Sequence, residues 1–173
     1  MTAKGTAAAR VAVVMGSDSD WEVMSRAAAR LDALKVPYEV TIASAHRSPE
    51  RTAAYAAGAR ERGIAVFIAG AGAAAHLAGA IAAHTTLPVI GVPLASTDLG
   101  GLDALLSTAQ MPAGVPVATV SVGEPGAENA AVLAAQILAL GDRALAGRLV
   151  RFKEDLAADV QEKDKRLKAK LAR

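Results

Sequence analysis

Short apolar runs alternate along the chain with segments whose apolar residues recur every three to four positions. The runs predict β-strands at residues 11–15, 38–43, 64–69, 88–92 and 117–122. The third run has no polar residue, as is typical of a parallel strand covered on both faces. The intervening segments predict helices at about 20–35, 49–62, 74–84, 100–108 and 126–140. This alternation predicts an α/β fold: a three-layer α/β/α, flavodoxin-like, doubly wound parallel sheet.

The segment after Gly141 predicts an extra C-terminal helix that carries one apolar stripe among many charges. The stripe consists of Leu145, Leu149, Phe152, Leu156, Val160, Leu167 and Leu171. Since the strand units are complete before it, the stripe needs another surface to cover. We expect a frayed tail at 1–9, an α/β catalytic domain at 10–142, and a helix at 143–173 that packs on a neighbouring subunit. Packing of this helix on its own domain is the alternative.

The composition indicates one domain with an aliphatic core. The chain has 173 residues, of which 53% are hydrophobic and only 3% aromatic. The absence of cysteine excludes disulfides and thiolate chemistry. No apolar run reaches the ~18 residues of a membrane span, and the first ten residues lack the apolar region of a signal peptide. We therefore expect a cytoplasmic protein with no membrane partner.

The net charge of +2 conceals an uneven distribution. Residues 143–173 hold ten Lys and Arg against five Asp and Glu, so the remaining chain is net acidic. A basic segment permits a nucleic-acid hypothesis, but no aromatic interleaving or nucleic-acid motif accompanies it. We interpret the charges as a solvated helix face and expect no nucleic-acid partner.

Polar residues gather where the first predicted strand ends. Ser19, followed three residues later by Glu22, has the pattern of a capping box, so a helix is predicted to begin there with free backbone N–H groups. Gly16 permits a tight turn, and Ser17 and Ser19 add hydroxyl donors, which together suit a phosphate. Asp20 has no capping role in this pattern, and its carboxylate suits the hydroxyls of a ribose.

A histidine and an arginine are adjacent where the second predicted strand ends, in the run Ser44-Ala45-His46-Arg47-Ser48-Pro49. Ser48 and Pro49 are suited to begin the next helix, which leaves His46 and Arg47 in the loop. Ligands of open α/β proteins bind at the carboxyl ends of the strands. An imidazole can transfer protons near neutral pH, and a guanidinium can bind a phosphate. A structural role for the histidine is the alternative to an acid/base role.

The third predicted strand ends in small residues, Gly70-Ala71-Gly72-Ala73-Ala74-Ala75-His76, which fit a relaxed dinucleotide fingerprint. That fingerprint belongs on the first strand unit and needs an acidic residue ~20 positions later. Because no Asp or Glu occurs between Glu61 and Asp98, a nicotinamide site is excluded. The loop would instead let a planar ligand approach the backbone, with His76 at its mouth. No metal-ligand spacing is present, so we expect no metal site.

Taken together, these loops resemble the PurE family of purine biosynthesis. The similarity extends from Val11 to about Phe152 and rests on several motifs in the same order. They are Val-Val-Met-Gly-Ser-x-Ser-Asp-Trp (13–21), Ser-Ala-His-Arg-x-Pro (44–49), Ala-Gly-Ala-Gly-x-Ala-Ala-His-Leu (69–77), Leu-Pro-Val-Ile-Gly-Val-Pro (87–93), Leu-Leu-Ser-x-x-Gln-Met-Pro (105–112) and Asn-Ala-Ala-x-Leu-Ala-Ala-Gln-Ile-Leu (129–138).

The resemblance implies a reaction and a site. Class I members of the family are N5-carboxyaminoimidazole ribonucleotide mutases, which move a carboxylate from N5 to C4 through bound CO₂ without metal, ATP or organic cofactor. By similarity, His46 would be the general acid/base and His76 would assist it. The substrate would be bound by Ser17, Ser19, Asp20, Ser44, Ala45, Arg47, Ala71, Gly72 and Leu77. A lid often contributed by a neighbouring subunit, commonly in a homo-octamer, would comprise Gln110, Met111 and Pro112.

Two features place the resemblance in class I. Class II members, which carboxylate aminoimidazole ribonucleotide directly with CO₂, tend to have lysine where this chain has Arg47, and they lack the Gly-rich run ending in His76. Ala73 stands where the family usually has a second glycine, and a positive φ there would cost about 1 kcal/mol or more. A class II carboxylase and a non-catalytic nucleotide-binding module are the alternative functions.

Overall fold

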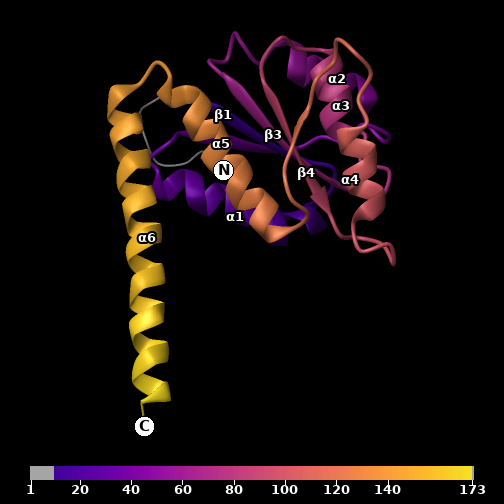
Figure 1. Cartoon of the computed structure of the whole chain (residues 1–173). Helices are drawn as coiled ribbons and strands as arrows, with labels where there is room; N and C mark the ends of the chain where they lie inside the picture. The colour runs from indigo at the N-terminus through magenta and orange to yellow at the C-terminus, as the bar shows by residue number, and fades with distance from the viewer. Residues whose placement is uncertain (1–9, 173) are drawn as a thin grey trace.

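Five parallel strands form the centre of the fold in a computed structural model that describes residues 10–172. The predicted tail at 1–9 lies outside the described residues. The strands are β1 (Val11–Met15), β2 (Tyr38–Ile42), β3 (Val66–Gly72), β4 (Val89–Leu94) and β5 (Ala118–Thr119). Their order in the sheet is β2-β1-β3-β4-β5, and every neighbouring pair is parallel. Figure 1 labels β1, β3 and β4 of this sheet. The order is that of a flavodoxin-like sheet, so the predicted fold class is confirmed.

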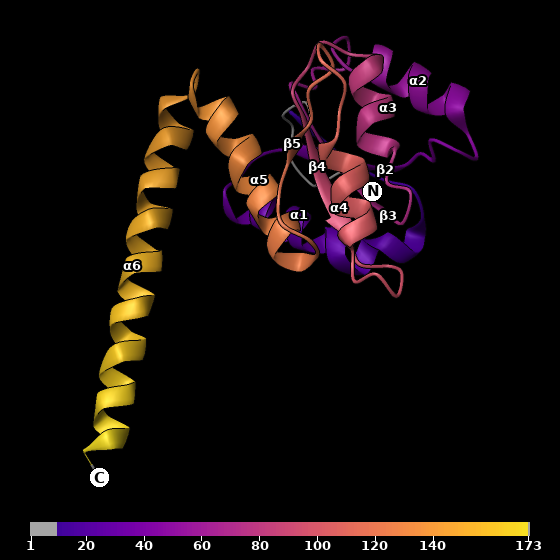
Figure 2. The same ribbon diagram turned by 45° about the vertical axis from the view of Figure 1, so that its right-hand side comes forward.

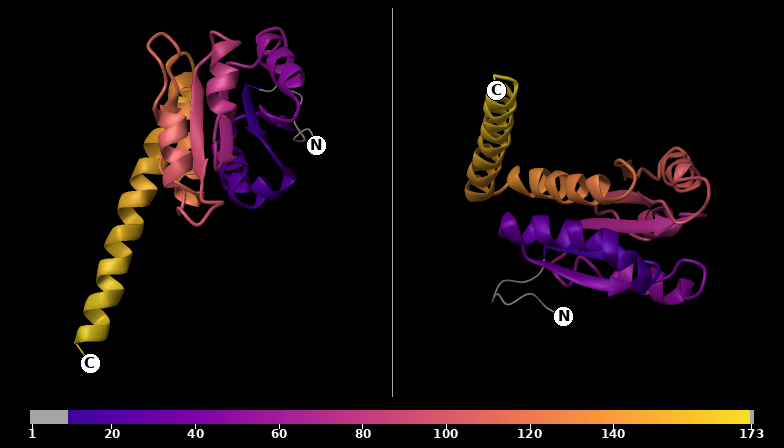
Figure 3. Two further views of the ribbon diagram at one scale, coloured as in Figure 1. Left: turned by 90° about the vertical axis from the view of Figure 1, so that its right-hand side faces the viewer. Right: turned by 90° about the horizontal axis from the view of Figure 1, so that it is seen from below.

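Helices cover both faces of this sheet. In chain order they are α1 (Trp21–Ala33), α2 (Pro49–Ala57), α3 (Leu77–Ala83), α4 (Leu102–Ala109), α5 (Glu124–Ala139) and α6 (Arg143–Leu171). A short 3-10 helix, η1 (Asp18–Asp20), directly precedes α1. Helices α1 and α5 pack on one face, and α2 and α3 pack on the other. The pictures show these layers from several sides (Figures 1 and 3).

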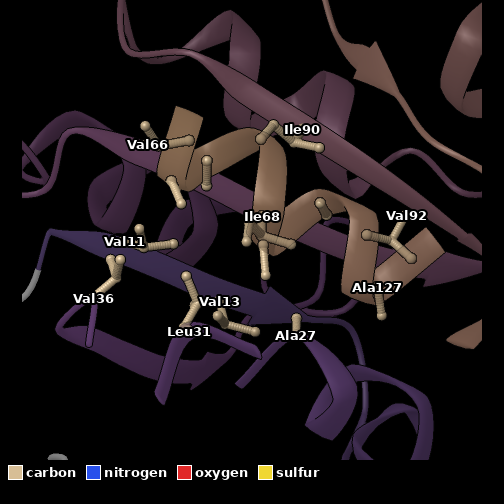
Figure 4. Packing of buried hydrophobic residues seen from close by; sticks show 14 of the residues in the cluster. Val11, Val13, Ala27, Leu31, Val36, Val66, Ile68, Ile90, Val92 and Ala127 are labelled. Carbon is tan, nitrogen blue, oxygen red and sulfur yellow. The ribbon is translucent and has the colours of Figure 1, made fainter. Parts of the chain in front are cut away.

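The apolar character of the strands follows from burial on two sides. In β1, Val11 and Val13 pack toward α1 and α5, whereas Ala12 and Val14 pack toward α2 and α3. Alternate residues of a strand point to opposite faces, so a strand covered by helices on both faces needs no polar positions. Figure 4 shows the cluster of buried side chains on the α1/α5 face of the sheet. The side chain of Ile68 on β3 lies there among side chains from α1 and α5.

The observed element boundaries differ from the predicted ones mainly where turns replace regular structure. Helix α2 ends at Ala57 instead of 62, because the chain turns through residues 58–63 and Gly63 takes a φ of 88°. Strand β5 comprises two residues, although residues 117–122 were predicted to form it. After β5 the chain keeps only isolated bonds to β4, from the N–H of Val120 to Gly91 O and from that of Gly123 to Pro93 O. Strand β3 runs on to Gly72, three residues beyond its predicted end.

Helix α6 begins on the domain and then leaves it. Leu145 is 2% exposed, Leu149 and Phe152 pack against the α1/α5 core, and the Arg148 Nε donates a hydrogen bond to Leu34 O at 2.7 Å. Residues 153–172 are exposed, and the helix projects away from the sheet (Figures 1 and 2). The proximal stripe therefore covers its own domain, and the distal stripe does not. Within residues 10–172 no helix is both long and apolar enough to cross a membrane.

Candidate functional site

A cavity of about 470 Å³ opens at the carboxyl edge of the sheet. Loops that follow β1, β2, β3 and β4 surround it, as expected for the ligand site of an open α/β protein. Every residue predicted for catalysis or substrate binding lines it. The lining residues are Gly16, Ser17, Ser19, Asp20, Ser44, Ala45, His46, Arg47, Ala71, Gly72, Ala74, His76, Leu77 and Ser96. The chain therefore brings together, from loops far apart in sequence, the groups that the motifs indicated.

Two histidines meet inside this cavity. His46, from the loop after β2, and His76, from the loop after β3, form a hydrogen bond of 2.8 Å between Nε2 and Nδ1. Their rings are 5.0 Å apart between centroids and stand edge to face at 79°. One ring must donate and the other accept, so the bond couples the tautomer of one imidazole to that of the other. The arrangement places two proton-transfer groups in direct contact at the ligand site.

The loop after β1 is closed by a capping box different from the predicted one. The Ser17 N–H donates to Asp20 Oδ2 at 3.0 Å, and the Ser19 N–H donates to Ser17 Oγ at 3.4 Å. The predicted box of Ser19 and Glu22 was wrong, because η1 begins the helical turn two residues earlier. Asp20 thus has a capping role that the sequence pattern did not indicate, and its carboxylate is held in a fixed position at the cavity wall.

The environment of Asp20 opposes its ionisation. Burial raises the pKa of the Asp20 carboxyl above its ordinary value of 3.8, whereas the N–H groups of Ser17 and Gly16 and the charge of Arg47 lower it by less. A carboxyl with a raised folded-state pKa binds protons more tightly in the folded than in the unfolded protein. Ionisation of Asp20 therefore lowers the free energy of unfolding as pH rises from 3.8 through the raised folded-state pKa.

Asp20→Asn is expected to gain stability relative to the unmodified protein as pH rises above 3.8, because an amide retains an oxygen acceptor and carries no charge to desolvate. Urea unfolding of both proteins across the acid range measures this as a difference in unfolding free energy. If Asp20→Asn instead lost stability relative to the unmodified protein as pH rises, the charge of Arg47 would lower the pKa of Asp20 by more than burial raises it.

Arg47 joins the first two loops. Its Nη2 donates to Gly16 O at 2.9 Å, and its backbone N–H donates to Ser44 Oγ at 3.1 Å. Ser48 occupies the predicted N-cap position of α2, but its hydroxyl bonds the backbone N–H and C=O of Ser44 instead of the helix. The guanidinium is therefore held beside the serine hydroxyls. Such a group can bind an anion such as a phosphate with charge-assisted hydrogen bonds.

Backbone constraints shape the loop after β3. A Cβ on Gly72 would collide with the side chain of Ser96, so only glycine fits there. Ala73 adopts a φ of 51°, the left-handed conformation that disfavours residues with a Cβ. Ser96 and Ala74 line the cavity but were not among the predicted site residues. Ser96 follows β4, so applying the strand-end criterion to the fourth strand would have identified it.

Ala73→Gly is expected to stabilise the protein by about 0.5–1 kcal/mol, because relief of the left-handed strain exceeds the entropy that glycine adds to the unfolded chain. For a chain of this size the melting temperature should rise by about 1–4 °C. Ala74→Gly is the matched control, because Ala74 has no positive φ and its substitution should destabilise. Equal losses in both variants would contradict the strain at Ala73.

The predicted lid does not line the cavity of its own chain. Gln110 is the C-cap residue that follows α4, and Met111 lies against α3, where its Sδ would be 3.0 Å from a Cβ placed on Gly79. Gln110, Met111 and Pro112 are all absent from the cavity lining. Within residues 10–172, no group of three or more His, Asp and Glu could hold a metal ion.

Comparisons with known proteins agree in family and fold. The family model described as AIR carboxylase matches residues 10–159. The chain is 56% identical over 167 residues to an N5-carboxyaminoimidazole ribonucleotide mutase of Mycobacterium tuberculosis, with 95% of each chain covered. It is also 56% identical over 157 residues to the mutase of Bacillus subtilis, covering 91% of this chain and 97% of that protein. The structure of Treponema denticola PurE superposes with a TM-score of 0.80 at 29% identity, covering 91% of this chain and 98% of that one.

Proposed function

Because the chain belongs to the AIR carboxylase family, we propose that it is an N5-carboxyaminoimidazole ribonucleotide mutase that uses His46 as its general acid/base. The relatives that carry this activity in their names align over nearly the whole chain. The observation that carries the proposal is the contact of His46 with His76 inside a cavity that also holds Arg47 and the loop serines. The activity belongs to purine biosynthesis, and its phosphorylated substrate suits a cytoplasmic enzyme.

The cavity accommodates the parts of a ribonucleotide in a definite order. Its volume of about 470 Å³ falls in the usual range of small-molecule sites. The 5′-phosphate binds Arg47 and the hydroxyls of Ser17, Ser19 and Ser44. The ribose hydroxyls bind Asp20, and the imidazole ring lies along Ala71 and Gly72, whose small size leaves the backbone accessible. This orientation brings the ring to the histidine pair.

The reaction requires one proton to be given and one to be taken. The bond between N5 and the carboxylate carbon breaks, CO₂ is released, and His46 supplies the proton that N5 needs. CO₂ remains in the cavity beside the small apolar side chains of Ala45, Ala71 and Leu77, which limit access of water. C4 then attacks CO₂ and forms the new carbon–carbon bond. His46 removes the C4 proton, so the enzyme ends in its starting state.

His76 acts on this cycle through His46. The two rings share a hydrogen bond through His46 Nε2, so one of them holds the shared proton. Substrate that displaces this bond leaves His46 Nε2 free to face the nucleotide. His76 is therefore a positioning residue that fixes the orientation and tautomer of His46 before binding.

The mutase is distinguished from a class II carboxylase by its substrate. We expect the purified protein to convert N5-carboxyaminoimidazole ribonucleotide in bicarbonate-free buffer, as measured by formation of the C4-carboxylated product. Product that forms only from the decarboxylated nucleotide and added bicarbonate would establish the carboxylase. Tight binding of the nucleotide without turnover in either assay would establish a non-catalytic binding module.

Assembly completes the site in this proposal. The protein forms a homo-oligomer, an octamer by resemblance to the family, in which Gln110, Met111 and Pro112 of one subunit close the cavity of another. The position of Met111 against α3, away from its own cavity, supports this arrangement. Light scattering at micromolar concentration should give a mass several times that of one chain, and a monomer would contradict it.

A further inference from the structure

The distal half of α6 carries an apolar stripe that touches nothing in its own domain. Leu156, Val160, Leu167 and Leu171 are exposed by 46%, 64%, 56% and 77%. About 30 Å of helix lies beyond Phe152 at 1.5 Å per residue, and in proteins most of the stability of a helix comes from packing of its apolar face. The family match ends at residue 159, so most of this segment lies beyond it. The stripe therefore needs a partner surface.

Charge divides this segment into two opposite halves. Residues 154–162 contain four acidic and no basic residues, and residues 163–171 contain five basic residues and one acidic residue. The halves thus carry net charges of −4 and +4. The pairs Lys163–Asp159 and Lys168–Asp164 connect charges within one helix, but they leave this separation along the helix in place.

The apolar residues are arranged symmetrically about the point between Lys163 and Asp164. Leu156 lies as far before this point as Leu171 lies after it, and the same holds for Val160 and Leu167. At about 100° per residue, the four side chains fall within an arc of about 60° on one side of the helix. A two-fold axis through this point would superpose the stripe of one helix on that of a second, antiparallel helix.

We propose that the distal half of α6 pairs antiparallel with the same segment of a second copy of this chain. In this register Leu156 lies opposite Leu171 of the second copy, and Val160 lies opposite Leu167 of the second copy. The acidic half of each helix then runs beside the basic half of the other. A parallel pair would place like charges together along its whole length, so the charge pattern selects the antiparallel arrangement.

The partner follows from this self-complementarity. A two-fold contact requires one surface to match itself, and this segment matches itself both in apolar spacing and in charge. A nucleic acid would use the basic half alone and would leave both the acidic half and the leucines unexplained. The pairing is independent of the catalytic proposal, because no residue of the cavity takes part in it.

Disulfide trapping tests the register directly, because the natural chain contains no cysteine. The full-length double variant V160C/L167C places two thiols opposite one another in the antiparallel pair. The double variant A158C/A169C is the matched control, because these alanines lie at similar levels on the opposite, exposed face of the helix. After mild oxidation with diamide, covalent dimers are measured by denaturing gel electrophoresis without reductant.

We expect V160C/L167C to give about tenfold more covalent dimer than A158C/A169C, because pairing raises the local thiol concentration. The single variants V160C and L167C should each give little covalent dimer. In an antiparallel pair the thiol of residue 160 is far along the helix from residue 160 of the second copy, and the same holds for residue 167. Efficient dimerisation of each single variant would establish a parallel pair and overturn the proposal. Equal trapping of both double variants, or trapping of neither, would also overturn it.

Charge is tested by adding the reversal K165E/R166E/K168E/K170E to V160C/L167C. Both halves of each helix would then be acidic, so trapping should fall to the level of the control. Helicity by circular dichroism verifies that α6 remains folded in this variant. Undiminished trapping would show that charge does not select the arrangement. Turnover of the nucleotide is a separate readout and should be unchanged in V160C/L167C.

Discussion

Replacement of His46 by asparagine should lower kcat by about a hundredfold to ten-thousandfold, the usual contribution of a general acid/base, while nucleotide affinity stays nearly unchanged. Asparagine can still bond His76, but it cannot give a proton to N5 or take one from C4. Both proton transfers of the proposed cycle use this one side chain, so its loss affects both. Steady-state kinetics with the N5-carboxylated nucleotide, together with calorimetric titration, separates turnover from binding.

His84→Asn is the matched control for this experiment. His84 is the C-cap residue that follows α3, is exposed, and is not among the residues that line the cavity. Its substitution removes one imidazole from the chain and should leave kcat unchanged. Substantial turnover by His46→Asn would overturn the role of His46 as proton carrier. Equal loss in both variants would indicate damage to the fold instead of loss of an acid/base group.

Arg47→Leu should lower kcat/KM by about tenfold to 150-fold, because a hydrogen bond to a charged group contributes about 1.5–3 kcal/mol. The side chain loses both its proposed phosphate contact and its bond to Gly16 O, which holds the first loop in position. The effect should fall mostly on KM, since the phosphate is bound in the ground state as well as in the transition state.

The dephosphorylated nucleoside distinguishes a phosphate contact from a loop defect. If Arg47 binds the phosphate, the unmodified protein and Arg47→Leu should process the nucleoside with similar, low efficiency. Arg51→Leu removes an exposed arginine of α2 that does not line the cavity, and it should leave KM unchanged. A loss in Arg47→Leu that persists with the nucleoside would assign Arg47 a purely structural role.

The period of the apolar residues was sufficient to predict the layers of this fold, because burial on two faces forces uninterrupted apolar strands. Element ends were less predictable. The end of α2 depends on Gly63 taking a positive φ, and β5 is short because the chain after it pairs with β4 only intermittently. The first outcome depends on a local backbone turn and the second on pairing with a distant segment, and the period of the apolar residues contains neither.

The site was predictable to the extent that strand ends converge on one edge of a parallel sheet. His46, His76 and Arg47 could be placed near one another from topology alone. The hydrogen bond between His46 and His76 could not be predicted, because it depends on the path of two loops whose small residues permit many conformations. The capping role of Asp20 was missed for a related reason: η1 shifts the start of the helix by two residues, which local pattern does not resolve.

The two outer strands of the sheet limit how copies of this protein can associate. Strand β5 comprises only two residues, and β2 at the other edge carries Glu39 and Thr41. A short edge offers few free backbone groups to an incoming strand, and polar and charged residues on an edge strand disfavour the addition of another strand. The sheet is thereby protected against growth from chain to chain.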